Sequence, residues 1–146
     1  IGACLAGASE EDQQRLYDFG VKMGLAFQLQ DDFLDVYGDP KVFGKNIGGD
    51  ILCNKKTYML ITALAMADEE QRKELEYWLS VREGQEKEKI AAVTRIYNNI
   101  GIGELCQRKI DALYEEGLAA LSTVELPEDR KKTLKALACS MMNRKM

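Results

Sequence analysis

Three carboxylates stand in a largely apolar stretch of the chain: Asp31, Asp32 and Asp35 within GLAFQLQDDFLDVYG. Neighbouring carboxylates repel one another, and burying them costs free energy unless a cation or hydrogen bonds compensate. Ligands that offer only oxygen suit Mg²⁺, which keeps several waters and is completed by the phosphates of a substrate, whereas zinc prefers nitrogen and sulfur. The three residues are therefore candidate magnesium ligands.

Two lysines, Lys45 and Lys55, follow in a stretch rich in glycine. A lysine ammonium is a compact charge that suits phosphate oxygens, and glycines leave a loop free to approach a ligand closely. The stretch is not a Walker-type phosphate loop, because GDPKVFGKN has five residues between its glycines and Asn46 in place of Ser or Thr. Carboxylates and lysines together predict a site for a metal-bound diphosphate.

We expect one helix from Gly20 to Tyr37 to carry the carboxylates. Along it, Gln28, Asp31 and Asp35 stand at i, i+3 and i+7 and share a face, while Asp32 lies about 100° further round. Ser9 and Asp12 are expected to form the N-cap and capping box. Apolar positions almost all round the helical wheel predict burial on most sides: Val21, Met23, Leu25, Ala26, Phe27, Leu29, Phe33, Leu34, Val36 and Tyr37.

The alternative to a metal site is an ordinary solvated surface. A DDxxD string alone is common on exposed helix faces, and an isolated lysine is usually a surface charge. The apolar flanking favours the metal site, because a solvated face would be interleaved with Lys and Glu.

The rest of the chain shows helical apolar spacing and no strand-like alternation, which favours an all-α fold. Helices are expected over residues 55–67, from Asp68 to about Val81, from Gln85 to Asn99, from Gly103 to Leu121, and from Pro127 onwards. In the last helix Leu134, Leu137, Ala138 and Met141 are expected to face the core.

Composition excludes several classes of protein. The chain has 146 residues, of which 46% are hydrophobic, enough to bury one sizeable core, and its net charge of −4 argues against a nucleic-acid partner. The absence of histidine argues against Ser-His or Cys-His hydrolysis. Four widely spaced cysteines favour reduced thiols and a cytoplasmic location, and no hydrophobic run has transmembrane length.

The string FQLQDDFLDVYGDPKVFGKNIGGDILCNKKTY resembles the second aspartate-rich motif of the trans-isoprenyl diphosphate synthases, with its GKxxGxD and KxT continuation. Terpene cyclases also carry a DDxxD but lack the GK loop and the downstream lysine in this arrangement. The resemblance implies an isoprenoid-synthase-type helical bundle that uses Mg²⁺ to condense isopentenyl diphosphate with an allylic prenyl diphosphate through an allylic carbocation.

Carried over residue by residue, the resemblance implies that Asp31 is a direct Mg²⁺ ligand and that Asp32 and Asp35 bind directly or through water. Lys45 and Lys55 would contact the allylic diphosphate, and the three aspartates with Lys45 would form the catalytic set. Phe27 and Gln28 also match, and would line the cavity between the substrates. Asp50 and Thr57 would shape the same cavity. Arg144 and Lys145 are similar to a basic C-terminal tail. Asn54 departs from the glycine of many members.

The family's first aspartate-rich motif and its GKxxR segment are absent from this sequence. Residues 1–146 are therefore expected to be a single incomplete domain, the C-terminal half of the synthase. Such a fragment is expected to lack full activity. We also expect a homo-oligomer, with residues such as Phe27, Phe33 and Leu34 exposed where other helices would cover them.

Two alternatives remain. One is a non-catalytic helical subunit derived from the same family that pairs with a catalytic partner, and the other is a helical scaffold with no affinity for diphosphate. Mg²⁺-dependent pyrophosphate binding that is lost in Asp31→Ala would exclude the scaffold.

Overall fold

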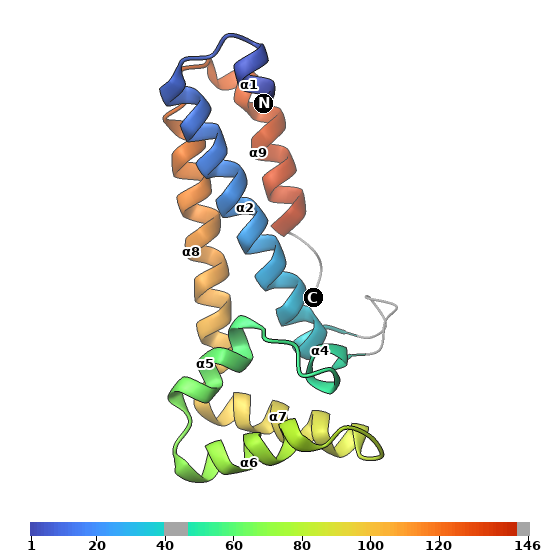
Figure 1. Ribbon diagram of the computed structural model, residues 1–146. Helices are drawn as coiled ribbons and strands as arrows, with labels where there is room; N and C mark the ends of the chain where they lie inside the picture. The colour runs from blue at the N-terminus through green and yellow to red at the C-terminus, as the bar shows by residue number, and fades with distance from the viewer. Residues whose placement is uncertain (40–46, 143–146) are drawn as a thin grey trace. The chain divides into compact units, whose positions relative to one another are not determined.

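The computed structural model describes residues 1–39 and 47–142, and in this part of the chain every regular element is a helix. The all-α fold class is therefore confirmed. No helix in the described residues is long and apolar enough to cross a membrane. The helices are α1 (Gly2–Leu5), α2 (Glu10–Tyr37), α4 (Gly49–Leu52), α5 (Tyr58–Met66), α6 (Glu69–Ser80), α7 (Glu86–Ile100), α8 (Ile102–Ser122) and α9 (Glu128–Met142) (Figure 1).

The helix predicted to carry the carboxylates is confirmed: it spans Glu10–Tyr37 and includes the whole of the predicted Gly20–Tyr37 segment. Its N-cap is Ser9, whose Oγ accepts a hydrogen bond from the Asp12 N–H at 3.2 Å. The Asp12 carboxylate accepts the backbone N–H of Glu125 at 3.1 and 3.2 Å and pairs with Arg15 at 3.0 Å. The Glu125 N–H is the main reason why the pKa of Asp12 is lowered. Asp12 thus ties the first turns of α2 to the segment after α8.

The remaining predicted helices are confirmed with small shifts at their ends. The expected cap of α6 is present as a full capping box, in which Asp68 and Gln71 satisfy each other's backbone N–H groups. Helix α5 begins only at Tyr58, because the Thr57 hydroxyl caps it by accepting the Leu60 N–H at 3.2 Å. Lys55 therefore lies in the loop before α5 and not in the helix.

Two expectations, one for the segment that forms α4 and one for α9, are wrong. The glycine-rich stretch that holds Lys45 and Lys55 is expected to be a loop, whereas its segment Gly49–Leu52 forms the helical turn α4. Leu137 was predicted to face the core but is exposed, because α9 turns Ala138 and not Leu137 toward the buried side. Apolar spacing alone did not distinguish these two neighbouring positions.

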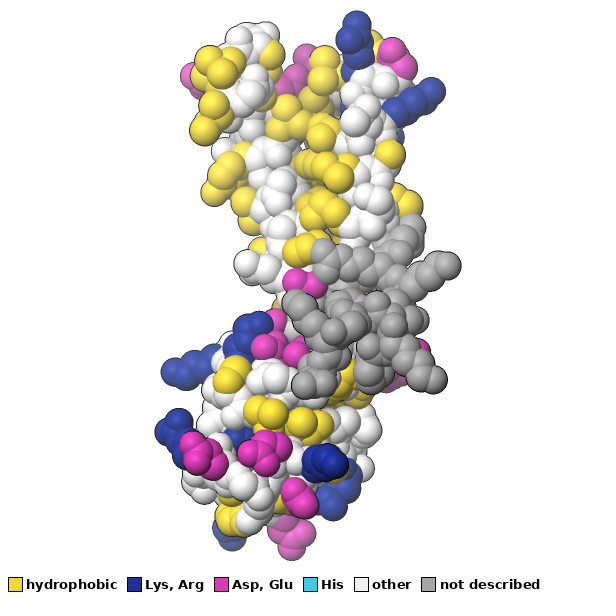
Figure 2. Space-filling view, turned by 90° about the vertical axis from the view of Figure 1, so that its right-hand side faces the viewer, with side chains coloured by type: hydrophobic (Ala, Val, Ile, Leu, Met, Phe, Trp, Pro, Cys, Tyr) yellow, Lys and Arg dark blue, Asp and Glu magenta, His cyan; other side chains and the backbone are white. Residues whose placement is uncertain are grey.

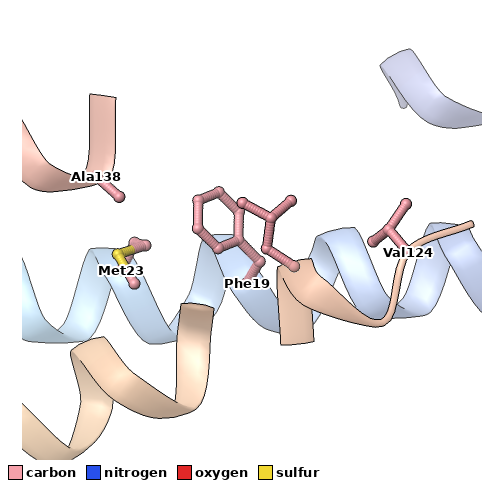
Figure 3. Packing of buried hydrophobic residues seen from close by; sticks show 5 residues of the cluster. Phe19, Met23, Val124 and Ala138 are labelled. Carbon is pink, nitrogen blue, oxygen red and sulfur yellow. The ribbon is translucent and has the colours of Figure 1, made fainter. Parts of the chain in front are cut away.

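The packing divides the chain into two compact units. The first unit comprises residues 1–28 and, of the described residues, 109–142, so it contains most of α2, most of α8, and α9. Its core is formed by Phe19, Met23, Leu121, Val124 and Ala138. Figure 3 shows Phe19 and Met23 on α2 beside Val124 and Ala138. The expectation of a single domain stays a prediction.

The second unit comprises Leu29–Arg108 and contains the end of α2, helices α4 to α7, and the start of α8. Helix α7 is central to it and packs against α4, α5 and α6. Leu34 on α2, Leu75 on α6 and Ile96 on α7 are almost completely buried. The prediction that Leu34 would be left exposed is therefore wrong. Leu34 lies in the buried core of this unit.

One face of α2 in the first unit is apolar and exposed. Tyr17, Val21 and Leu25 follow one another at i, i+4 and i+8 and keep 66%, 40% and 45% of their surface accessible. The expected burial on most sides of α2 is wrong for this face. Figure 2 shows hydrophobic side chains gathered on the surface of this unit.

An apolar stripe of this kind is typical of an interface, so we expect the chain to self-associate through Val21 and Leu25. Burying an aliphatic side chain stabilises by about 1.5–3 kcal/mol when burial is complete, so replacing both residues by serine should weaken association about tenfold or more. Sedimentation equilibrium measures the effect. The control is Ile61→Ser, because Ile61 is an exposed aliphatic residue on α5, outside the stripe. A wild-type chain that stays monomeric at high micromolar concentration would contradict the prediction.

Candidate functional site

The last two turns of α2 present the predicted carboxylates. Asp31 and Asp35 lie one turn apart on the same face of the continuous helix, as expected. Asp31 is exposed, whereas Asp32 and Asp35 are partly buried. Phe27 and Gln28 precede Asp31 by one turn of the same helix, with Phe27 partly buried and Gln28 exposed.

Lys55 lies between two carboxylates. Its ammonium is 2.7 Å from Asp32 Oδ1 and 2.9 Å from Asp50 Oδ2. Hydrogen bonds to both carboxylates hold the pKa of Lys55 well above its usual range, so the side chain stays protonated. Half of the Lys55 side chain, 51%, is nevertheless exposed, which leaves the charge accessible to an anion from solvent.

Burial governs the charge of Asp32. Desolvation raises the pKa of its carboxyl, the hydrogen bond from Lys55 opposes that rise, and the nearby Asp50 carboxylate adds to it. Because burial outweighs the ion pair, Asp32 gives up its proton less readily than an exposed aspartate. A further cation beside Asp32 would favour its charged form.

Asp35 fastens α4 to the end of α2. Its Oδ2 accepts the backbone N–H of Asp50 at 2.9 Å, and its carbonyl oxygen accepts the N–H of Gly48 at 2.7 Å. Gly48 has a φ of +89°, and a Cβ added to it would lie 2.6 Å from the side chain of Ile90. Both facts disfavour any residue with a side chain at this position. These contacts bring Asp50 to the same place as Asp32 and Lys55.

The structure brings several of the predicted residues together. Asp32, Asp35, Asp50 and Lys55 are linked by the contacts above. Thr57 is buried, its hydroxyl caps α5, and it lines the same small cavity as Asp50 and Lys55. The predictions for three further basic residues lie outside the described residues: Lys45, Arg144 and Lys145.

The donor set is compatible with Mg²⁺. Within residues 1–39 and 47–142 no three acidic or cysteine side chains converge closely enough to hold a metal ion. Mg²⁺ is usually bound through one or two carboxylates, with waters and substrate phosphates completing its shell, and so needs no such cage. Exposed Asp31 and the carboxylates of Asp32 and Asp35 offer the oxygens that this ion prefers.

Sequence reasoning missed Lys89. It is buried, with 3% of its surface accessible. Its ammonium donates to Oδ1 of Asn54, the residue before Lys55, at 2.7 Å. A signal was present in the sequence, because Lys89, Val93 and Ile96 stand at i, i+4 and i+7 and share the buried face of α7. Lys89 ends the charged run QEKEK, which is typical of a solvent-exposed helix start.

Comparison with known proteins identifies related chains. The polyprenyl synthetase family model matches residues 1–99. A short chain isoprenyl diphosphate synthase of Methanocaldococcus jannaschii is 45% identical over 75 residues, which are 51% of this chain and 23% of the relative. A geranylgeranyl diphosphate synthase of Saccharolobus solfataricus is 30% identical over 139 residues, 94% of this chain and 40% of the relative.

Solved structures share the fold. A geranylgeranyl pyrophosphate synthase crystal structure has a TM-score of 0.87 at 33% identity, over 99% of this chain and 45% of the other. A Corynebacterium glutamicum geranylgeranyl pyrophosphate synthase, complexed with isoprenyl diphosphate and magnesium, has a TM-score of 0.84 at 35% identity, over 99% of this chain and 41% of the other. This chain therefore spans less than half the length of these relatives.

Replacing Lys55 by methionine should raise the pKa of Asp32 further. The ammonium that lowers this pKa is lost, while Asp50, which raises it, remains. Carboxyl-carbon NMR titration measures the shift, and Lys56→Met is the matched control because it removes the adjacent, exposed lysine. An Asp32 titration that is the same in both variants would show that the Lys55 ion pair is not formed in solution.

Proposed function

The chain belongs to the polyprenyl synthetase family, and we propose that it supplies the diphosphate-binding part of an enzyme that condenses isopentenyl diphosphate with an allylic prenyl diphosphate. The observation that carries the proposal is the protonated, half-exposed Lys55, held by Asp32 and Asp50 next to the acidic face of α2. This arrangement offers carboxylate oxygens for a cation and an ammonium for phosphate oxygens. A diphosphate with bound Mg²⁺ needs both.

Asp31, Asp32 and Asp35 are the residues that would hold Mg²⁺. Their oxygen-only donor set supports this assignment. The Corynebacterium glutamicum relative is complexed with magnesium, which supports the choice of ion. When bound, the ion would neutralise charge on the diphosphate and so make it a better leaving group. Asp31 is exposed and accessible to such a complex, and Asp32 and Asp35 lie within one turn of it.

In the proposed reaction the allylic carbon–oxygen bond breaks and pyrophosphate leaves with the bonding electrons. The double bond of isopentenyl diphosphate attacks the allylic cation to form a carbon–carbon bond, and the proton released from the product passes to pyrophosphate. Lys45 and Lys55 would stabilise the charge that develops on the departing group, while Phe27 and Gln28 would line the space between the substrates. None of these steps needs a histidine.

The chain by itself holds one aspartate-rich motif, and its relatives are more than twice as long. The complete reaction is therefore proposed for an assembly that contains the remainder of the fold. The exposed stripe of α2 supports the proposal of an oligomer. A cytoplasmic location stays a prediction.

Binding of inorganic pyrophosphate tests the diphosphate site directly. We expect wild-type chain to bind pyrophosphate in the presence of Mg²⁺ and not with EDTA. Asp31→Ala should weaken binding by about tenfold or more, since each lost charged contact is worth about 1.4 kcal/mol or more. Isothermal titration calorimetry measures the affinity.

The control variant is Asp129→Ala, which makes the same charge change at an exposed residue in the first turn of α9. It should leave pyrophosphate affinity unchanged. If wild-type chain shows no Mg²⁺-dependent binding, the proposed function is wrong and the helical scaffold becomes the better interpretation.

A protein made of these 146 residues alone should not condense prenyl diphosphates. The first aspartate-rich motif would be absent, and loss of such charge partners costs on the order of 10³-fold in rate. The assay mixes purified chain with Mg²⁺, geranyl diphosphate and radiolabelled isopentenyl diphosphate. Measurable turnover by the purified chain would contradict the expectation.

A further inference from the structure

We propose that Lys89 is a positioning residue for Lys55 and acts through Asn54; this inference rests on the proposed diphosphate site. Lys89 lies in the first turn of α7, and Lys55 lies in the loop between α4 and α5. Asn54 joins them, because its side chain bonds Lys89 and its main chain leads directly into Lys55.

The Lys89 ammonium has an acceptor for each of its three protons. It donates to Asn54 Oδ1 at 2.7 Å, to the carbonyl oxygen of Val81 at 2.9 Å and to that of Leu52 at 3.4 Å. These acceptors belong to the residue after α6 and to the end of α4 with the turn that follows it. One buried charge therefore connects the start of α7 to the turn that carries Lys55.

Asn54 is held at both ends of its amide. Its Oδ1 accepts from Lys89, and its Nδ2 donates to the carbonyl oxygen of Leu79 on α6 at 2.8 Å. Its backbone has φ of +55°, in the left-handed region that few side chains adopt without local support. The backbone N–H groups of Asn54 and Lys55 close the turn on the carbonyl oxygens of Ile51 at 3.2 Å and Asp50 at 2.9 Å.

This turn decides where the Lys55 side chain starts. A rotation of the Asn54 backbone would swing the next Cα–Cβ bond away from Asp32 and Asp50, since the two residues share a peptide bond. The amide contacts to Lys89 and Leu79 oppose such a rotation. Lys55 thereby keeps the direction in which it meets both carboxylates.

Lys89 does not itself serve as a ligand-binding residue. The cavity that Asn54, Lys55 and Lys89 help to line has a volume of about 10 Å³, room for about one water molecule and not for a diphosphate. Burying an ammonium costs free energy, and a methionine of similar length would fill the same space without that cost. The burial of Lys89 is therefore better explained by its hydrogen bonds, which hold the turn that carries Lys55.

The test uses Lys89→Met in the full chain, with two measurements. Hydrogen exchange should speed up at least tenfold at the amides of Asn54 and Lys55, and Mg²⁺-dependent pyrophosphate affinity should fall about tenfold. Lys87→Met is the matched control, because Lys87 is an exposed lysine on the same helix. It should leave both measurements at the wild-type values.

A double-mutant cycle shows whether Lys89 acts through Lys55. If it does, Lys89→Met should cause no further loss of pyrophosphate affinity in a chain that already carries Lys55→Met. Equal losses in both backgrounds would show that Lys89 acts independently of Lys55 and would overturn the proposal.

Asn54→Gly provides a second variant in case Lys89→Met fails to fold. Glycine accepts the left-handed backbone but removes the amide, so the same faster exchange at Lys55 and the same loss of affinity are expected. Unchanged exchange at Lys55 in a folded variant would overturn the positioning role. If wild-type chain binds no pyrophosphate, the proposed function is wrong, whereas the exchange rates still decide whether Lys89 fixes the Lys55 turn.

Discussion

The contact on which the candidate site depends is the ammonium of Lys55 between the carboxylates of Asp32 and Asp50. Each partner comes from a different element, so the three side chains meet only when α2, α4 and the loop before α5 are all in place. Asp35 contributes by fixing α4 to the end of α2 through the Asp50 N–H. The positive charge of Lys55 reduces the repulsion between the carboxylates of Asp32 and Asp50.

Among the residues that the structure describes, each unit contains one buried lysine whose ammonium donates to backbone carbonyl oxygens. Lys89 donates to Leu52 and Val81 in the second unit, and Lys131 donates to the carbonyl oxygen of Ser122 at 3.0 Å in the first. Lys131 also pairs with Glu128 at 3.2 Å, whereas Lys89 donates to the neutral amide of Asn54 and to two backbone carbonyl oxygens. Desolvation accordingly lowers the pKa of Lys89. In both cases the long side chain reaches carbonyl groups that a helix or turn leaves without a partner.

The sequence predicted the parts of the fold that depend on local chemistry. The side-chain caps at Ser9 and Asp68 and the apolar period of α2 and α7 identified helices, and the spacing of Asp31 and Asp35 placed them on one face. It did not predict α4, since four residues with a glycine at the start carry no periodic signal. Nor could spacing show that Lys55 pairs with Asp32, 23 positions earlier, or that Leu137 is exposed, because both depend on tertiary packing.

Gly48 limits how this site can change over generations. Two independent constraints act on it: a left-handed backbone, and the side chain of Ile90 in the space that a Cβ would need. Shortening Ile90 to alanine would remove the steric conflict but leave the backbone penalty, so a compensating substitution at position 90 could restore only part of the loss. Drift at these two positions is therefore asymmetric. Ile90 can be substituted while Gly48 is kept. A substitution of Gly48 cannot be fully compensated by a change at Ile90, because the backbone penalty remains.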